Sequence, residues 1–297
     1  MPVLHRAPQG IGQQYSAAIR SAGVGSALTL QLEMRVLLCG LAAAVLCAAC
    51  TDIGDLPAQP TGNVTSQPAP SPGSPTGQQI TIVRRFAAPG RPEGLTWDGQ
   101  SLWVSDNGGS IFKLGTTGDV LGNFSAPEVT PQGITWDGSA FWLFTTNQFF
   151  IYQFRVSGDQ TTTIQSFRSQ AAVIGGGLSQ DLAWDGSNLW HANRFNIFRM
   201  TPEGVLVNTL SRSKDVDGLD WDGSRLWLGE NNFPNFAAII AIDTTGRTLG
   251  TFVSPVFEIE ALAWGAPYLW ALGTDTLAGT ETIYQLDISR AVAALAR

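Results

Sequence analysis

The sequence has 297 residues, of which 44% are hydrophobic and 14% are charged, and its formal net charge is −7. This length allows one or two domains, and the composition is typical of a globular, strand-rich protein. The acidic balance argues against nucleic acid or anionic lipid as a partner, because both need a basic face. The three cysteines, Cys39, Cys47 and Cys50, precede the globular part, which therefore has no disulfide or thiol chemistry.

The chain begins with two segments that we do not expect to belong to the fold. Residues 1–33 show no hydrophobic period and are predicted to be a disordered extension, or one that a misassigned start has added. Met34 is the alternative start, because a signal peptide is predicted over 34–50. Arg35 gives the positive end and Val36–Ala49 the apolar stretch, which is too short to span a bilayer of about 30 Å comfortably.

The end of this segment, Leu46-Cys-Ala-Ala-Cys50, resembles a bacterial lipobox, in which the last cysteine is lipidated. The resemblance implies an extracytoplasmic protein that is anchored to the bacterial cell membrane or outer membrane through Cys50. Ordinary cleavage near Ala49, followed by release, is the alternative. Residues 51–79 are rich in Pro, Ser, Thr and Gly, and they are expected to form an extended tether because they cannot bury a core.

The domain predicted over 80–297 contains five copies of a ten-residue phrase that first appears as Gly94–Trp103. The copies use all ten tryptophans as pairs six residues apart: Trp97/Trp103, Trp136/Trp142, Trp184/Trp190, Trp221/Trp227 and Trp264/Trp270. The first tryptophans of successive pairs are 39, 48, 37 and 43 residues apart, which is the length of one propeller blade. The sequence therefore predicts an all-β, five-bladed β-propeller with these tryptophans in its core.

Each unit is expected to form four strands. In the first unit, Asp98-Gly99 separates two apolar runs and is expected to close a tight hairpin, because glycine adopts positive φ at little cost. Two further strands follow, Ser110–Leu114 and Val120–Ala126, with a Gly turn between them. The fifth unit lacks the last strand, whereas Ile80–Ala88 matches its pattern. We therefore predict that this N-terminal strand completes the last blade and closes the ring.

Short phrases within the units resemble two families of bacterial propeller enzymes. Pro131-Gln-Gly-Ile134 and the count of five blades are similar to propeller-type glutaminyl cyclases, which form N-terminal pyroglutamate. Pro92-Glu-Gly-Leu95 and Val216-Asp-Gly-Leu-Asp220 resemble, more weakly, gluconolactonase and regucalcin-like propellers. That second resemblance implies carboxylates that hold a divalent metal.

Polar side chains recur at one rim of the expected channel. The residue before each phrase, or the first residue of the phrase, supplies Glu93, Gln132, Gln180, Asp181, Asp217 and Glu260. The second strand of the hairpin returns to the same rim and supplies Asp106, Asn193, Arg194 and Glu230. Three of these carboxylates, Glu93, Asp217 and Glu260, have the hard oxygen ligands that Ca²⁺ prefers, and they form the predicted metal site. A hydrated polar rim without an ion is the alternative.

These observations predict a lipid-anchored, monomeric binding module in the cell envelope, with an unknown small ligand, peptide or protein on the rim. An enzyme of the glutaminyl cyclase or metal-dependent lactonase type is the alternative. An enzyme needs an accessible funnel of polar groups, whereas a binding module tolerates a plugged channel. His191, which follows Trp190, is the single histidine of the domain and is expected to be a buried blade residue.

Overall fold

The computed structural model of the protein describes residues 79–170, 181–232 and 235–296. They belong to one compact unit, Ala69–Arg297. The predictions for the extension 1–33, for the signal segment with Cys50, for the tether up to residue 78 and for Gln180 lie outside the described residues. Among the residues that are described, no helix is long and apolar enough to cross a membrane.

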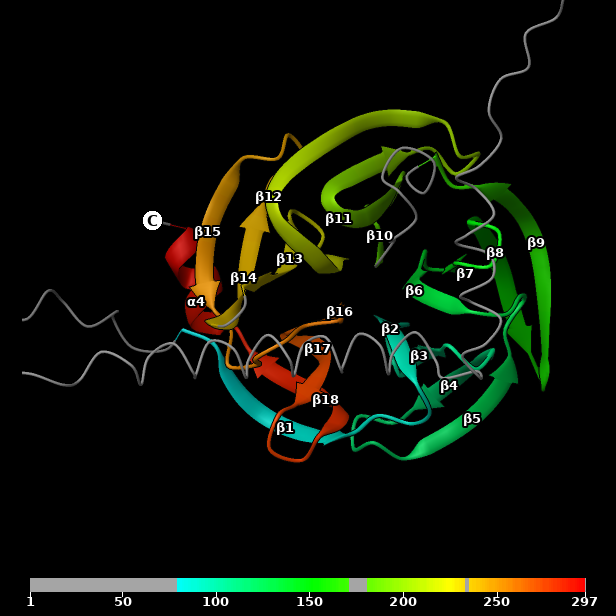
Figure 1. The fold of residues 1–297 in the computed structure, drawn as a ribbon, viewed down its shortest axis with the longest axis horizontal. Helices are drawn as coiled ribbons and strands as arrows, with labels where there is room; N and C mark the ends of the chain where they lie inside the picture. The colour runs from blue at the N-terminus through cyan, green and yellow to red at the C-terminus, as the bar shows by residue number, and fades with distance from the viewer. Residues whose placement is uncertain (1–78, 171–180, 233–234, 297) are drawn as a thin grey trace, which may run out of the picture. The chain divides into compact units, whose positions relative to one another are not determined.

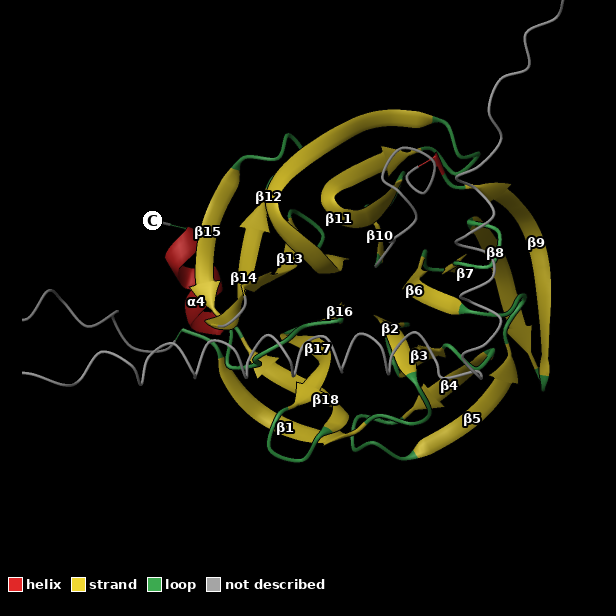
Figure 2. Cartoon of the chain, viewed as in Figure 1, coloured by secondary structure: helices red, strands yellow, loops and turns green. Residues whose placement is uncertain are grey.

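The described part is almost entirely β-sheet, as the composition predicts (Figure 2). One four-stranded sheet contains β2 (Pro92–Trp97), β3 (Leu102–Asp106), β4 (Ser110–Leu114) and β5 (Val120–Ser125). A second contains β6 (Pro131–Trp136), β7 (Phe141–Thr145), β8 (Phe150–Ser157) and β9 (Gln160–Arg168). A third contains β16 (Ala261–Gly265), β17 (Tyr268–Asp275), β18 (Thr280–Asp287) and β1 (Thr81–Ala87). In all three, neighbouring strands pair antiparallel.

The remaining strands form one six-stranded sheet, and this corrects the prediction of five separate blades. The sheet contains β10 (Leu182–Trp184), β11 (Leu189–Met200), β12 (Leu206–Trp221), β13 (Leu226–Asn232), β14 (Asn235–Ile242) and β15 (Thr248–Val253). The described residues therefore form four sheets, although five tryptophan hairpins are present.

The long strand β12 joins the third and fourth repeats. Its first half, Leu206 to Ser211, pairs with β11, and its second half, from Val216, pairs with β13; Val216 also pairs with Arg194 of β11. The segment 211–216 that connects the two halves contains no proline, so its backbone can stay extended. The connections before β2, β6 and β16 contain Pro89, Pro127 and Pro255, respectively. In each of these connections the backbone is not in the strand conformation.

The sheets are arranged around a common axis, as Figure 1 shows. The innermost strands β2, β6, β10, β12 and β16 contact one another in a closed cycle, with β16 beside β2. β1 pairs with β18 from Thr81↔Asp287 to Ala87↔Thr282, which confirms that the N-terminal strand closes the ring. The helix α4 (Ser289–Leu295) follows β18 and packs against β15.

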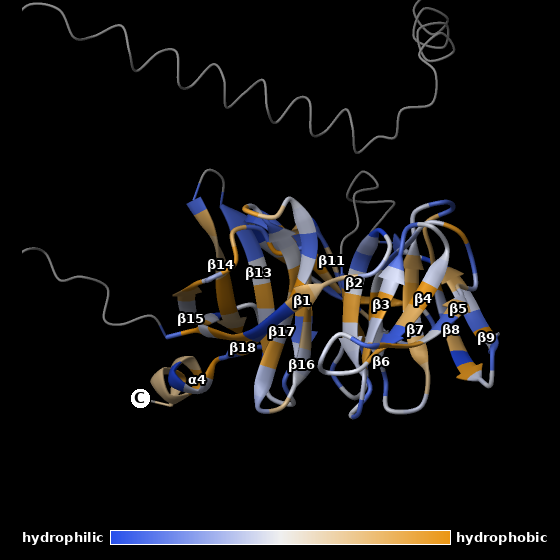
Figure 3. Cartoon of the chain, turned by 90° about the horizontal axis from the view of Figure 1, so that it is seen from below, coloured by the Kyte–Doolittle hydropathy of each residue, from blue (hydrophilic) through white to orange (hydrophobic). Residues whose placement is uncertain are grey.

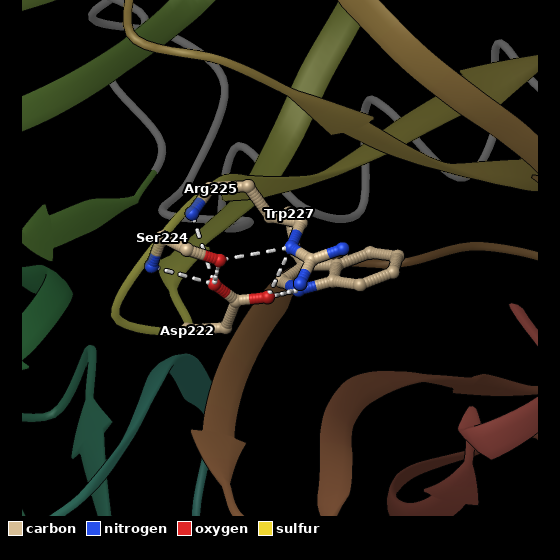
Figure 4. A network of polar contacts seen from close by, with 4 residues as sticks. All are labelled: Asp222, Ser224, Arg225 and Trp227. Atoms are coloured by element: carbon tan, nitrogen blue, oxygen red, sulfur yellow. Dashed lines mark hydrogen bonds and ion pairs between the residues drawn. The ribbon is translucent and has the colours of Figure 1, made fainter. Parts of the chain in front are cut away.

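The repeated phrase forms the hairpin that its residues predict, and its aspartate has a further role. In the fourth repeat, Oδ1 of Asp222 accepts hydrogen bonds from the backbone N–H of Ser224 and of Arg225, both at 2.9 Å. Its Oδ2 accepts the indole N–H of Trp227 at 2.8 Å (Figure 4). Gly223 has a φ of 96°, a conformation that favours glycine.

The same contacts hold the turns of the first three repeats, where Asp98, Asp137 and Asp185 accept the indole N–H of the tryptophan five residues later.

The second tryptophan of each pair lies in the core, with at most 4% of its surface exposed. The first tryptophan of each pair is half-buried. Trp142 stacks on Trp184 and Trp270 stacks on Trp97, each with an interplanar angle of 14°, so the second tryptophan of one repeat packs against the first of the next. Hydrophobic segments run along strands such as β3 and β14 in Figure 3. The prediction that the tryptophans build the core is confirmed for the second tryptophan of each pair, whereas the first is only partly buried.

Candidate binding rim

Strand pairing places several predicted site residues at the end of the ring opposite the Asp-Gly turns. Pro92, next to Glu93, pairs with Asp106 at the end of β3. Val216, next to Asp217, pairs with Glu230 in β13. In the last sheet, Thr274 of β17 pairs with Glu281 of β18 at the same end.

Glu93 lies half-buried at the start of β2 and is held by amide side chains. Asn107 Nδ2 donates to Glu93 Oε1 at 2.8 Å, and the side chain of Gln132, in β6, also forms a hydrogen bond with this carboxylate. Burial nevertheless raises the pKa of Glu93, and the negative charge of Glu281 adds to the increase. Glu93 and Gln132 are therefore neighbours at the rim end.

Asp217 is buried in β12, where the Asn231 side chain donates to Oδ2 and bridges to the backbone of Ile259. Burial raises its pKa to about 7, and the charges of Asp215 and Glu258 act in the same direction. A carboxyl group with this pKa exchanges its proton near neutral pH.

Glu260 is the point where the acidic groups meet. It lies half-buried just before β16, and its backbone N–H donates to the carbonyl of Leu272 at 2.8 Å. Burial raises its pKa well above the usual value. Four carboxylates raise it further: Glu258, Asp217, Glu281 and Glu93. We call these five residues, Glu93, Asp217, Glu258, Glu260 and Glu281, the carboxylate rim.

Sequence reasoning missed two members of the carboxylate rim, Glu258 and Glu281. Glu258 is buried in the connection before β16, and its carbonyl lies against Gly273 of β17, where no Cβ would fit. Glu281 is the second residue of β18 and accepts a hydrogen bond from Thr274 Oγ1 at 3.2 Å. Burial, followed by the charge of Glu258, raises the pKa of Glu281. The sequence signal for both was their position near a strand start at the rim end, with Glu258 three residues before Ala261 and Glu281 one residue after Thr280.

The predicted metal set is Glu93, Asp217 and Glu260. Within the described ranges, no group of three or more His, Cys, Asp or Glu side chains is arranged so that it could hold a metal ion. The three carboxylates influence one another electrostatically, but the Ca²⁺ site stays a prediction.

Four other predicted site residues have structural partners. Asp106 accepts hydrogen bonds from the backbone N–H of Arg91 and of Gly108 and so shapes the loops around β3. Glu230 forms an ion pair with Arg212 at 2.6 Å. Arg194, in β11, has an ion pair with Asp215 at 3.5 Å, and Asn193 beside it is buried.

Asp181 is buried among the inner strands of the ring and is not exposed at the rim. The first residue of the phrase is Gly94, Gly133, Gly218 or Ala261 in the other repeats. A Cβ at Gly94 would lie 2.9 Å from the Cα of Gly133, so the inner strands approach too closely there for a larger side chain.

In the third repeat the side chain of Asp181 is fully buried and its carboxylate joins three inner strands. It accepts the backbone N–H groups of Leu182, Leu219 and Leu262 at 2.9, 3.0 and 3.2 Å. The Asp181 carboxylate therefore links β10, β12 and β16 inside the ring.

His191 is fully buried, as predicted, and lies 2.9 Å from Ser169 Oγ through Nδ1. Burial lowers its pKa to about 3, and its ring packs on Phe144 with the centroids 4.6 Å apart. Ser169 is also fully buried, so this serine–histidine pair presents no surface to a substrate.

The comparisons with known proteins support the fold. No family model matches the sequence, and no curated protein matches it. The crystal structure of Myxococcus xanthus glutaminyl cyclase aligns with a TM-score of 0.53 at 13% identity, over 70% of this chain and 95% of that chain. At this identity the alignment shows a shared propeller fold. A chain of the mitotic checkpoint complex aligns with a TM-score of 0.44 at 18% identity, over 77% of this chain and 76% of that chain.

Proposed function

We propose that this protein is a binding module of the bacterial cell envelope whose carboxylate rim binds a positively charged peptide segment. The observation that carries the proposal is the gathering of five carboxylates at the rim end of the strands, where burial, followed by mutual repulsion, raises the pKa of Glu260, Asp217 and Glu281. Like charges that repel one another in a half-buried site are stabilised when a cation binds between them. The rim is thus suited to ammonium or guanidinium groups.

Two features of the structure favour a peptide over a small metal ion. The rim carboxylates come from β2, β12, β18 and the connection before β16, so they form an arc along the neighbouring inner strands β12, β16 and β2 that several cationic groups of one peptide can follow. The positive charge of Arg194 partly opposes the increase in the pKa of Asp217, and that of Arg91 partly opposes the increase in the pKa of Glu93. Guanidinium groups are therefore accommodated near these carboxylates. Below the rim, the Asp181 carboxylate accepts hydrogen bonds from the inner strands β12 and β16, which favours binding at the surface over passage through a channel.

Calorimetry with a hexalysine peptide tests the proposal. We expect binding to the wild type that weakens with added salt, because the contact is electrostatic. The double substitution Glu93→Gln, Asp217→Asn should weaken it by about tenfold or more. The matched control Asp159→Asn, Glu203→Gln removes two exposed acids at the turn end and should leave the affinity within about twofold. Equal losses in both variants would show that only net charge attracts the peptide.

An acid–base enzyme is the second candidate, and the pKa of about 7 of Asp217 favours it. A carboxyl group that is half-ionised at neutral pH is suited to act as a general base. Assays with an N-terminal glutaminyl peptide and with a lactone, with and without Ca²⁺, test the cyclase and lactonase alternatives. Activity that Asp217→Asn abolishes while the protein stays folded would favour the enzyme.

The location in the envelope is proposed from the sequence, and Cys50 carries it. If Cys50 is lipidated, Cys50→Ser should move the protein from the membrane fraction to the soluble fraction. Membrane association that is unchanged by this substitution would contradict the anchor. We also propose that the protein is monomeric and that the six-stranded sheet corresponds to two fused blades of a five-repeat ring.

A further inference from the structure

A cavity of about 360 Å³ lies between the first and second repeats, near the turn end of the ring. It is separate from the carboxylate rim, and the inference drawn from it does not depend on the proposed function. Its walls are formed by the aromatic side chains of Trp103, Phe124, Trp136 and Phe141. Three departures from the repeat pattern occur together at this interface.

The first departure is Phe141, which stands where the other repeats have leucine. Its ring lies 4.6 Å from Trp103 and 4.5 Å from Trp136, between the second tryptophan of one repeat and the first of the next. At two other interfaces the corresponding tryptophans stack directly at 6.3 and 6.4 Å. Phe141 therefore replaces direct tryptophan stacking at this interface.

The second departure is an uncovered turn. At neighbouring interfaces the outer strand of one repeat places a phenylalanine over a turn glycine of the next repeat, as Phe86 does at Gly118 and Phe167 at Gly204. The ring of Phe124 instead lies against Gly122 of its own strand, and Gly158 has no atom near its Cβ position. This leaves the space beside Gly158 open.

The third departure is the charge at the cavity. The residue opposite the second tryptophan bonds to the turn aspartate in the next two repeats, through Gln153 to Asp137 at 2.9 Å and through Arg199 to Asp185 at 3.1 Å. In the first repeat this residue is Lys113, whose ammonium lies 5.2 Å from the centroid of Trp103. Within the described part of the chain, no carboxylate lies within ion-pair distance of Lys113.

A second cation, Arg155, also lines the cavity, and its Nε donates a long hydrogen bond of 3.4 Å to the carbonyl of Ser139. The turn aspartate Asp98 already accepts the indole N–H of Trp103 and two backbone N–H groups. The cavity thus combines aromatic walls with two cations that can each gain a charge-assisted hydrogen bond to an anion.

We propose that this cavity binds a small aromatic carboxylate. Aromatic walls recognise a flat apolar ring by stacking and edge contacts, and a few placed polar groups orient such a ligand. Lys113 and Arg155 bind the carboxylate at the mouth.

The probe is 2-naphthoate, and 2-naphthamide is its uncharged counterpart. In titrations followed by calorimetry and by ligand-observed NMR, the wild-type protein should bind naphthoate and should bind the amide about tenfold more weakly. Lys113→Gln and Arg155→Gln should each weaken naphthoate binding by about tenfold. Ser139→Phe, which adds a ring at the exposed mouth, should abolish binding without removing a charge.

The matched control is Lys214→Gln, which removes a lysine that bonds to Asn232 and does not line the cavity. It should leave the affinity within about twofold. The proposal is overturned if naphthoate does not bind the wild type at millimolar concentration. It is also overturned if Lys113→Gln and Arg155→Gln leave the affinity unchanged, or weaken it no more than the control does.

Discussion

At the scale of single residues, the turn aspartate links each tight hairpin to the core. Asp222 accepts two backbone N–H groups of its own turn and the indole N–H of Trp227, which is fully buried. A carboxylate can accept all three hydrogen bonds, whereas an amide side chain has only one accepting oxygen. The phrase Trp-Asp-Gly thus specifies both the turn and the position of the second tryptophan.

Asp222→Asn should therefore lower the free energy of unfolding by about 2 kcal/mol, because it leaves a buried N–H without an acceptor. Urea unfolding followed by tryptophan fluorescence measures the change. Asp159→Asn is the control, since Asp159 is exposed in a turn, and it should alter the free energy of unfolding by less than about 0.5 kcal/mol. Equal effects of the two substitutions would contradict the role given to the turn aspartate.

The sequence predicted correctly that the second tryptophan of each pair is buried, because the spacing of the pairs is a property of the repeat. It did not predict that Asp181 is buried among the inner strands. That placement depends on how closely the inner strands approach each other, as they do at Gly94 and Gly133. The departure of Asp181 from the small residues of the other repeats was the available signal. Glu258 was missed because it lies in an irregular connection, where strand periodicity gives no direction.

At the scale of elements, β1 is the strand whose contacts are most distant in the sequence. It pairs with β18 along its length, and the ring of Phe86 lies 6.3 Å from that of Trp270. Ile80, just before β1, is fully buried in the cluster that contains Trp227. The pattern match between Ile80–Ala88 and the outer strands predicted this pairing.

Deletion of residues 80–88 should remove the outer strand of the last sheet and expose the edge of β18. We expect a large fall in the melting temperature, or aggregation. Deletion of residues 60–68, an equally long part of the Pro-rich segment, is the control and should leave the melting temperature unchanged. A protein without residues 80–88 that remains monomeric and equally stable would contradict the closure by β1.

The number of sheets could not be predicted from the repeats alone. Five hairpins predicted five blades, whereas β12 continues through the third connection and joins two repeats into one sheet. The missing proline in segment 211–216 permits this continuation but does not require it. Whether the two repeats join into one sheet depends on the pairing of β12 with both β11 and β13.

At the scale of the whole molecule, buried carboxyl groups make stability depend on pH. Burial raises the pKa of Asp217 and of Asp220 to about 7, from an ordinary value of 3.8. Between these values the folded protein holds protons that the unfolded chain releases, so stability falls as pH rises. His191, whose pKa is about 3, acts in the opposite direction below its ordinary value of 6.5, but it is a single group.

We therefore expect the melting temperature to decrease between about pH 5 and pH 7.5 and to level off above that range. Asp217→Asn should flatten this decrease and raise the melting temperature at about pH 8, with little effect near pH 4. Differential scanning calorimetry across this range measures both curves. A melting temperature that rises steadily to pH 8 would contradict the raised pKa values.

The proposed function makes one more claim at this scale, which is that cation binding and proton release are coupled at the carboxylate rim. A cation favours the ionised form of Asp217, Glu260 and Glu281, so binding below their raised pKa values must release protons.

The most direct test is calorimetric titration with hexalysine at about pH 6.5, repeated in buffers of different ionisation enthalpy, from which the number of protons released is obtained. We predict a net release of protons that is smaller in the Glu93→Gln, Asp217→Asn variant, which keeps Glu260 and Glu281. Binding without any proton release in the wild type, or no binding, would contradict the account.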